Sequence, residues 1–227
     1  TDNDSAGFTL TQSGGSTSVS EAGTTDTFTI VLNAQPASDV VLTVTSSDTG
    51  EATVNSPLTF TAGNWNSAQT VTVTGIDDNI IDGTITSTIT IAVDDANSDN
   101  NFDPVANQTV SATTTDNDVA GFTIVQSGGS TSVAETGTTD TFTIVLNAQP
   151  TSDVVVLAMT SNDTGEATVS GSLTFTAANW DTPQTVTVTG IDDDIIDGTI
   201  TSTITISIVD DISDNDFDAV ADQTVSA

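Results

Sequence analysis

Apolar and polar residues alternate along most of this chain, in short runs separated by Gly, Pro, Asn and Asp. Phe28, Ile30 and Leu32 occupy every second position of one run, and Val71 and Val73 do so in another. A period of two places the apolar side chains on one face of a β-strand. Helical periodicity is missing, and no apolar run approaches the length of a membrane-spanning helix. We therefore expect an all-β protein.

The pattern predicts seven strands in the first half of the chain. They are Phe8–Ser20 with a break at Gly14-Gly15, Asp26–Leu32, Val40–Ser46, Leu58–Thr61, Thr70–Thr74, Thr84–Val93 and Thr109–Thr114. Short strands separated by turn residues are typical of an antiparallel β-sandwich with immunoglobulin-like topology. A sandwich of this size buries enough surface to form a core of its own.

The same unit occurs twice. The stretch AGFTLTQSGGSTSV at Ala6 returns almost unchanged at Ala120, and NWNSAQTVTVTGIDD at Asn64 returns as NWDTPQTVTVTGIDD at Asn179. The offset grows from 114 to 115 residues, which indicates one inserted residue near positions 154–158. We expect residues 1–4 to be the tail of a preceding repeat, 5–118 the first repeat and 119–227 the second. Seven strands put the two ends of a repeat at opposite poles, which predicts a head-to-tail tandem array cut from a longer protein.

The amino-acid composition excludes most kinds of catalytic and binding site. The chain has 32 acidic residues and no Lys, Arg, His or Cys, for a formal charge of −32. Catalytic triads with histidine, thiolate nucleophiles, Schiff bases and phosphate clamps are all excluded. Nucleic acid and anionic membrane surfaces should be repelled, and we expect no direct membrane insertion. A carboxylate pair for glycoside hydrolysis stays possible in principle, but two Trp and no Tyr offer little for a sugar cleft. We expect no enzyme activity and a cation as the partner.

The acidic residues gather at one pole of the predicted sandwich. Strands alternate in direction, so the loops after the first, third, fifth and seventh strands share one end. In the first repeat these loops carry Glu21, Asp48, Glu51, Asp77, Asp78, Asp82, Asp116 and Asp118. Many carboxylates in one loop cluster repel each other without a counterion, and six to eight hard oxygen ligands suit Ca²⁺ better than Mg²⁺. The alternative is that these loops are solvated surface.

The second repeat offers an equivalent set of candidate ligands: Glu135, Asp163, Glu166, Asp192, Asp193 and Asp197. Asp211 and Asp214 lie in the acidic loop after the sixth strand, at the opposite pole, where an array could share an ion with Asp116 or Asp118. The alternative there is a free charged loop. Asp26, Asp39, Asp153 and Asp222 are isolated and are expected to be solvated surface, whereas Trp65 and Trp180 are expected to cap the cores.

Together these motifs resemble Calx-beta repeats, the Ca²⁺-binding sandwich modules of sodium–calcium exchangers, integrin β4 and large bacterial surface proteins. Val19-Ser20-Glu21 matches the acid after the first strand of that family, and the segment from Asp48 to Thr53 loosely matches its Asp-Gly-Thr-Ala loop. The segment GIDDNIIDGT matches its Asp-Asp cluster, and TDND at residues 115–118 matches its terminal acids. Asn79 and Asn117 stand where the family has acids. The resemblance implies a Ca²⁺-binding sandwich in both repeats, and the Asn-Trp and Gln-Thr-Val-Thr-Val stretches look like those of giant bacterial adhesins.

These observations predict a Ca²⁺-binding structural repeat in which calcium rigidifies a tandem array acting as a spacer in adhesion or matrix. Its partners would be calcium ions and neighbouring repeats of the same chain. Lack of Cys suits an exported bacterial protein at the cell surface or outside the cell. Two alternatives remain: a subunit of a self-assembling extracellular filament or sheath, built from identical subunits, and a Ca²⁺-dependent module that binds a glycan or protein.

Overall fold

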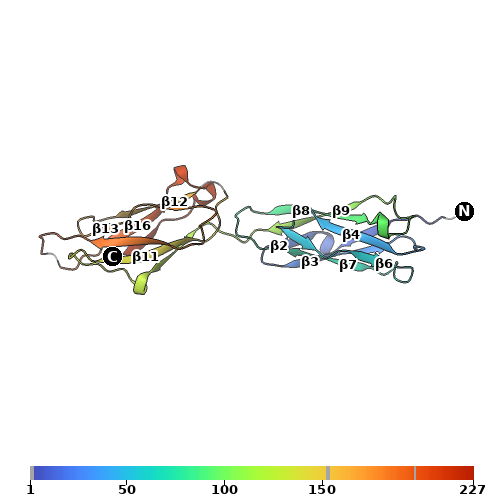
Figure 1. Cartoon of the computed structure of the whole chain (residues 1–227), viewed down its shortest axis with the longest axis horizontal. Helices are drawn as coiled ribbons and strands as arrows, with labels where there is room; N and C mark the ends of the chain where they lie inside the picture. Colours follow the sequence, from blue (N-terminus) through green and yellow to red (C-terminus); the bar gives the residue numbers. More distant parts are fainter. Residues whose placement is uncertain (1–2, 152–153, 197) are drawn as a thin grey trace. The chain divides into compact units, whose positions relative to one another are not determined.

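The computed structural model describes residues 3–151, 154–196 and 198–227 of an all-β chain (Figure 1). The chain folds into two compact units. The first comprises Thr1–Asp78 and Asp82–Asn117, and the second comprises Asn79–Ile81 and Asp118–Ala227. Each unit is a sandwich of two sheets. None of the described helices, each a single 3₁₀ turn, is long and apolar enough to cross a membrane.

The first unit contains nine strand segments and two 3₁₀ turns. The strands are β1 (Phe8–Gln12), β2 (Thr17–Ser20), β3 (Thr25–Leu32), β4 (Val40–Ser46), β5 (Ala52–Val54), β6 (Leu58–Phe60), β7 (Gln69–Gly75), β8 (Ile85–Val93) and β9 (Gln108–Thr115). The turns are η1 (Ser13–Gly15) and η2 (Asp95–Asn97). One sheet has the order β1-β3-β7-β5 and the other the order β2-β9-β8-β4-β6.

The first predicted strand is broken where the sequence indicated, and its two halves join different sheets. Gly14 and Gly15 have φ angles of 61° and 83°, which side chains other than glycine rarely adopt. As a result β1 pairs antiparallel with β3, whereas β2 pairs parallel with β9. The short strand β5 was not expected, because its three residues are too few to show a period. It pairs with β7 at Ala52↔Gly75.

The core of the first unit lies between its two sheets. Phe28, Ile30, Val71 and Val73 are fully buried from one side, as alternation predicted, and Ile89 is among those that meet them from the other. Trp65 packs at the edge of this cluster, and Trp180 does so in the second unit. Both therefore cap the core, as expected.

The second unit repeats the arrangement with fewer strand segments. They are β10 (Phe122–Gln126), β11 (Thr139–Leu146), β12 (Val155–Ser161), β13 (Ala167–Val169), β14 (Leu173–Phe175), β15 (Gln184–Gly190), β16 (Thr203–Ile208) and β17 (Gln223–Ser226), with 3₁₀ turns η3 (Ser127–Gly129), η4 (Asp210–Ile212) and η5 (Asn215–Phe217). The sheet orders are β10-β11-β15-β13 and β14-β12-β16-β17. Residues 131–134, the counterpart of β2, form no strand.

One expectation about isolated acids was wrong. Asp26 is not free solvated surface: its carboxylate accepts hydrogen bonds from Ser13 Oγ at 2.6 Å, Ser18 N–H at 2.9 Å and Thr27 N–H at 2.7 Å. These bonds, led by the one from Ser13, hold the pKa of Asp26 below its usual value. The carboxylate thereby fastens the Gly-Gly turn to β3. The sequence did not reveal this role, because two of the three donors, Ser13 and Ser18, lie outside the strand that contains Asp26.

Candidate metal centre

Glu21 lies immediately after β2 and is fixed by the last strand of its unit. Its backbone N–H donates to the carbonyl oxygen of Thr115 at 3.1 Å, and its Oε2 accepts from the N–H of Asn117 at 3.1 Å. A tight turn follows, in which Gly23 N–H donates to Ser20 at 3.1 Å and Gly23 has a φ of 75°. The Glu21 side chain is only 1% exposed.

Glu51 closes the loop between β4 and β5. The carboxylate of Asp48 accepts the N–H of Gly50 at 3.0 Å, which bends the loop. The carbonyl oxygen of Glu51 then accepts the N–H of Ile76 at 2.9 Å and the hydroxyl of Thr114 at 3.3 Å. Its side chain is 5% exposed. The backbone of Glu51 is thus tied to both the β7 end and the β9 end of the unit.

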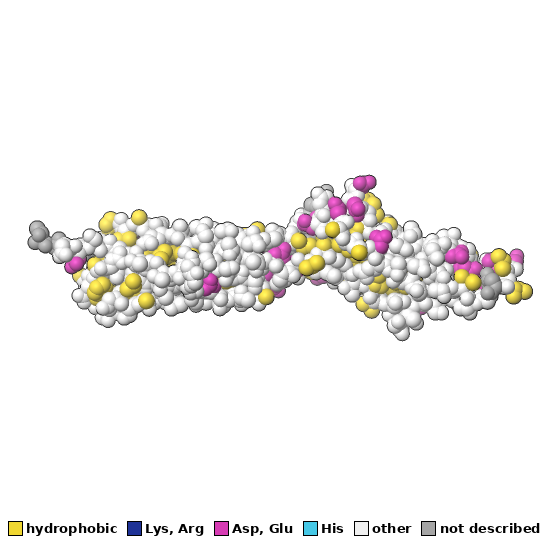
Figure 2. Space-filling view, turned by 180° about the vertical axis from the view of Figure 1, so that it is seen from behind, with side chains coloured by type: hydrophobic (Ala, Val, Ile, Leu, Met, Phe, Trp, Pro, Cys, Tyr) yellow, Lys and Arg dark blue, Asp and Glu magenta, His cyan; other side chains and the backbone are white. Residues whose placement is uncertain are grey.

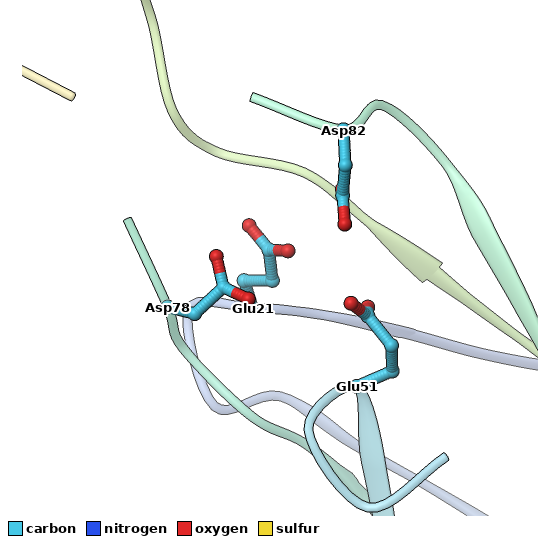
Figure 3. A group of neighbouring side chains, drawn as sticks. All are labelled: Glu21, Glu51, Asp78 and Asp82. Carbon is cyan, nitrogen blue, oxygen red and sulfur yellow. The ribbon is translucent and has the colours of Figure 1, made fainter. Parts of the chain in front are cut away.

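Asp78 and Asp82 come from the loop after β7. Gly83 follows Asp82 in this loop. Its φ of 75° allows its N–H to donate a hydrogen bond to Oδ2 of Asp116 at 2.9 Å. Asp78 is half-buried, whereas Asp82 is exposed as a residue. Both side chains still point inward toward Glu21 and Glu51 (Figure 3).

These four side chains converge on one point. One carboxylate oxygen from each of Glu21, Glu51, Asp78 and Asp82 lies within 4.8 Å of all the others. Oε1 of Glu21 and Oε2 of Glu51 are buried and have no hydrogen-bond partner. A buried, unpaired carboxylate oxygen normally costs more than 1 kcal/mol. A cation bound among the four acids would give both oxygens a partner.

Burial and mutual repulsion raise the pKa values of three of the four clustered acids. Burial raises the pKa of Glu51 to about 7, and the charge of Asp82 adds to the shift. Burial also raises the pKa of Glu21 and of Asp82, with neighbouring carboxylates adding to both shifts. For Glu21 the hydrogen bond from Asn117 works in the opposite direction. Without a cation, the cluster is relieved only by taking up protons.

The donor set fits a hard divalent cation. Ca²⁺ binds six to eight oxygens at 2.3–2.6 Å, so ligands on opposite sides of one ion lie at most about 5 Å apart. The four carboxylates meet that limit and supply only oxygen. Since carboxylates bind Ca²⁺ through one or both oxygens, four of them can provide most of the coordination shell.

The other predicted ligands of the first repeat are placed around this cluster in different ways. Asp116 lies with one carboxylate oxygen within 4.8 Å of one from Glu21. Asp48 and Asp77 are exposed, and each is engaged in shaping a loop: Asp48 bonds Gly50, and Asp77 accepts Asn117 Nδ2 at 3.0 Å. Asp118 belongs to the second unit.

The second repeat does not assemble the same cluster among its described residues. Glu135 and Glu166, the counterparts of Glu21 and Glu51, are half-buried rather than buried. Asp163 bonds Gly165 N–H at 3.0 Å, as Asp48 bonds Gly50, and Asp193 accepts Ile195 N–H at 2.7 Å. Asp192 is exposed. Asp197, the counterpart of Asp82, and the isolated Asp153 lie outside the described residues.

The two predicted ligands of the loop after β16 belong to none of the carboxylate groups in the described part of the chain that could hold a metal ion. Asp211 is exposed. Asp214 is 3% exposed and accepts the N–H of Thr151 at 2.8 Å and the N–H of Asp216 at 3.1 Å. Its counterpart Asp99 accepts three backbone N–H groups, from Ala37 at 2.6 Å, Ser38 at 3.0 Å and Asn101 at 3.0 Å. These acids fasten the loop after β8 or β16 to the segment that precedes β4 or β12.

Three contributors to the cluster carry no acidic signal in the sequence. Thr114, Gly83 and Asn117 position the ligands through backbone or hydroxyl donors. The tetrad TDND, which occurs at residues 1–4 and again at 115–118, was the only hint in the sequence for Asn117, and nothing in the sequence pointed to Thr114. Figure 2 shows the acidic side chains as separate groups on a mostly uncharged face.

Comparison with known proteins gives similarities of structure only. No family model and no curated protein matches the chain. Among solved structures, CBD12 from CALX1.2 has a TM-score of 0.35 and 13% identity, over 87% of this chain and 79% of that chain. The calcium binding domain CBD12 of CALX1.1 has a TM-score of 0.34 and 12% identity, over 88% and 80%. The S-layer protein rSbsC(31-844) has a TM-score of 0.39 and 16% identity, over 99% of this chain and 28% of that chain.

Proposed function

We propose that the chain is a Ca²⁺-binding structural repeat of an extracellular tandem array, and that Glu21, Glu51, Asp78 and Asp82 hold the ion in the first unit. One observation carries the proposal: two buried carboxylate oxygens without partners face a centre shared by four acids. Calcium would pair these oxygens and cancel the repulsion among the acids. We propose a structural rather than an enzymatic role, because without Lys, Arg, His or Cys only carboxylate chemistry is left to the chain.

Calcium would stabilise the fold because its ligands come from segments far apart in the chain. Glu21 follows β2, Glu51 precedes β5, and Asp78 and Asp82 follow β7. An ion that binds only the folded state adds about 2.7 kcal/mol to stability when its free concentration is one hundred times the dissociation constant. Two carboxylates 4 Å apart repel by about 4 kcal/mol at an effective dielectric constant of 20. Calcium therefore acts on a unit that is electrostatically strained without it.

Stabilisation by Ca²⁺ suits a protein that folds after export. Free Ca²⁺ is scarce inside cells and abundant outside, so binding would stabilise the repeat only where it works. The two near-identical repeats would each contribute the same spacer element to the array.

Calorimetric titration of the whole chain with Ca²⁺, and separately with Mg²⁺, tests the proposal. The decisive variant is Glu51→Gln, which keeps the shape of the side chain and removes its charge. Asp95→Asn is the matched control, because it removes one charge from an exposed acid in η2, away from the cluster. Glu51→Gln should weaken the tightest Ca²⁺ site at least tenfold, and the control should leave it within about twofold.

Two results would contradict the proposal. One is the absence of a Ca²⁺-dependent rise in melting temperature for the unmodified chain. The other is an equal loss of affinity in both variants, which would mean that only the net charge of the chain attracts the ion.

A further inference from the structure

A short strap of residues 19–24 comprises the end of β2 and the turn that leads to β3. β2 lies at the edge of its sheet, with β9 as its neighbour. Just before the strap, the N–H of Ser18 donates to Oδ2 of Asp26 at 2.9 Å. At its far end, the carbonyl oxygen of Thr24 accepts the N–H of Gly75 at 3.0 Å. The strap is therefore anchored at both of its ends.

Two hydrogen bonds within the strap make it a compact turn. The N–H of Ser20 donates to Oγ1 of Thr24 at 2.7 Å, and the N–H of Gly23 donates to the carbonyl oxygen of Ser20 at 3.1 Å. Because these bonds join residues of the strap to each other, they persist when the strap moves as one body. Such a movement costs only the contacts that the strap makes with the rest of the first unit.

Main-chain hydrogen bonds to the end of β9 and one apolar side chain hold the middle of the strap against the unit. The N–H of Glu21 donates to the carbonyl oxygen of Thr115, and the N–H of Asn117 donates to Oε2 of Glu21, both at 3.1 Å. Val19 is 3% exposed and belongs to the core, whereas Ala22 is exposed. A single valine supplies only a small part of the apolar burial that stabilises the unit.

The charge of Glu21 works against these contacts. Its Oε1 is buried without a hydrogen-bond partner. One of its carboxylate oxygens lies within 4.8 Å of one from each of Glu51, Asp78 and Asp82 (Figure 3). Without a cation, an outward movement of the strap would return the charge of Glu21 to water and increase its distance from the other acids. Those acids lie in other loops, so the strap can move without them.

We propose that the strap is a hinged segment controlled by charge. Without a bound cation, residues 19–24 swing away from the end of β9 while the rest of the first unit stays folded, and Ca²⁺ holds them closed. The opening follows from repulsion among the acids, whereas the closing by Ca²⁺ rests on the proposed calcium function. An open strap uncovers Val19 and the edge of β9. Since an uncovered strand edge pairs readily with other extended segments, a closed strap protects the array from such pairing.

Thiol labelling tests the proposal, because the chain contains no Cys of its own. Val19→Cys places a thiol in the strap, and Val44→Cys places one in β4, where the side chain is 2% exposed and reports unfolding of the whole unit. Each variant is made alone and together with Glu21→Gln, which removes the charge and keeps the shape. Reaction with a maleimide is followed in EDTA.

The Val19→Cys thiol should react about tenfold faster than the Val44→Cys thiol, or more, because local opening is more frequent than global unfolding. Glu21→Gln should slow the reaction of Val19→Cys by a much larger factor than that of Val44→Cys. Equal rates for the two thiols in EDTA would overturn the proposal. Equal slowing of both by Glu21→Gln would also overturn it, since the charge would then act on the whole unit.

Amide hydrogen exchange of the chain without cysteine gives an independent readout. In EDTA the N–H groups of Glu21 and Asn117, which link the strap to the end of β9, should exchange about tenfold faster than that of Phe28 in the core, or more. Equal exchange at Glu21 and Phe28 would contradict a local opening.

Added Ca²⁺ keeps the two proposals apart. Fast labelling of Val19→Cys that Glu21→Gln slows but Ca²⁺ does not would support the charge-controlled strap and contradict the calcium function. A rise in melting temperature with Ca²⁺, in a chain whose Val19→Cys thiol reacts in EDTA as slowly as Val44→Cys, would overturn the strap and leave the calcium function intact.

Discussion

The backbone N–H of Asn117 donates a 3.1 Å hydrogen bond to Oε2 of Glu21, a residue 96 positions earlier in the chain. This bond satisfies one oxygen of a buried carboxylate and leaves the other, Oε1, facing the acidic cluster without a partner. The final segment of the first unit therefore aims Glu21 at the cluster. A candidate ligand near the beginning of the unit is set in place only when the end of the unit has folded.

The first prediction concerns pH in the absence of calcium. Glu51 has a pKa of about 7 in the folded state and an ordinary value near 4.5 when unfolded. Between these two pKa values, Glu51 is protonated in the folded state and ionised in the unfolded state. The contribution of this proton to the free energy of unfolding is therefore complete below pH 4.5 and is lost as the pH rises to 7. Each unit of separation corresponds to about 1.4 kcal/mol. Raised pKa values of Glu21 and Asp82 act in the same direction.

Urea unfolding in EDTA at pH 5 and pH 8 measures this effect. A Trp180→Phe chain leaves Trp65 as the only fluorescent reporter, and Trp65 packs on the first core. The free energy of unfolding should be lower at pH 8 than at pH 5 by about 2 kcal/mol or more. Equal stability at the two pH values would show that the cluster carries no electrostatic strain.

The second prediction is that Glu51→Gln stabilises the calcium-free protein at pH 8. The substitution removes a negative charge that sits among carboxylates, while keeping the size of the side chain. The melting temperature of the first unit should rise in EDTA, and its response to a given Ca²⁺ concentration should become smaller. Glu166→Gln is the matched control at the same position of the second repeat, where the side chain is half-buried. A fall in melting temperature for Glu51→Gln would mean that its charge is already compensated.

The third prediction concerns Asp26, which lies outside the cluster. Asp26→Ala removes three hydrogen bonds to a charged acceptor and should lower the free energy of unfolding by about 2–3 kcal/mol. The loss should be the same with and without Ca²⁺. Asp39→Ala, an exposed acid before β4, is the control and should change stability by less than about 0.5 kcal/mol. Urea unfolding with the Trp65 reporter measures both variants.

The fourth prediction concerns a close backbone approach behind Glu21. A Cβ at Gly75 would lie 2.1 Å from the carbonyl oxygen of Ser20, which is backbone and cannot rotate away. Gly75→Ala should push β2 out of place, lower stability by at least about 2 kcal/mol and weaken Ca²⁺ binding together with it. At Gly63 the nearest atom would be 3.7 Å away, so Gly63→Ala is the control. Thermal unfolding and calcium titration of both variants provide the measurement.

Much of the fold could be predicted from the sequence because the strands alternate cleanly. The patterns in Phe28–Leu32 and Val71–Val73 marked buried faces, and the strand order then placed the acidic loops at one pole. Glu21, Glu51, Asp78 and Asp82 do meet there. Strand β5 was missed, since Ala52–Val54 is too short for a period to appear.

The distinction among the acids could not be predicted, because it depends on donors from distant segments. Asp48 and Asp77 look like ligands in the sequence but shape loops by accepting hydrogen bonds from Gly50 and Asn117. Asp26 looked like free surface, yet Ser13 and Ser18 hold it. Burial also separates near-identical copies: Glu21 is 1% exposed, whereas Glu135 is half-buried, although the sequences around the two differ only at Ala134 and Thr136.

The parallel pairing of β2 with β9 has a mechanical consequence. These strands lie near the beginning and the end of the first unit and run side by side in the same direction. Tension applied to the two ends of the unit would slide one strand along the other, so that their hydrogen bonds are loaded in shear and must break together. Glu21 lies just beyond the end of β2. An ion held there by Glu21 and the neighbouring acids would resist the sliding of β2 along β9.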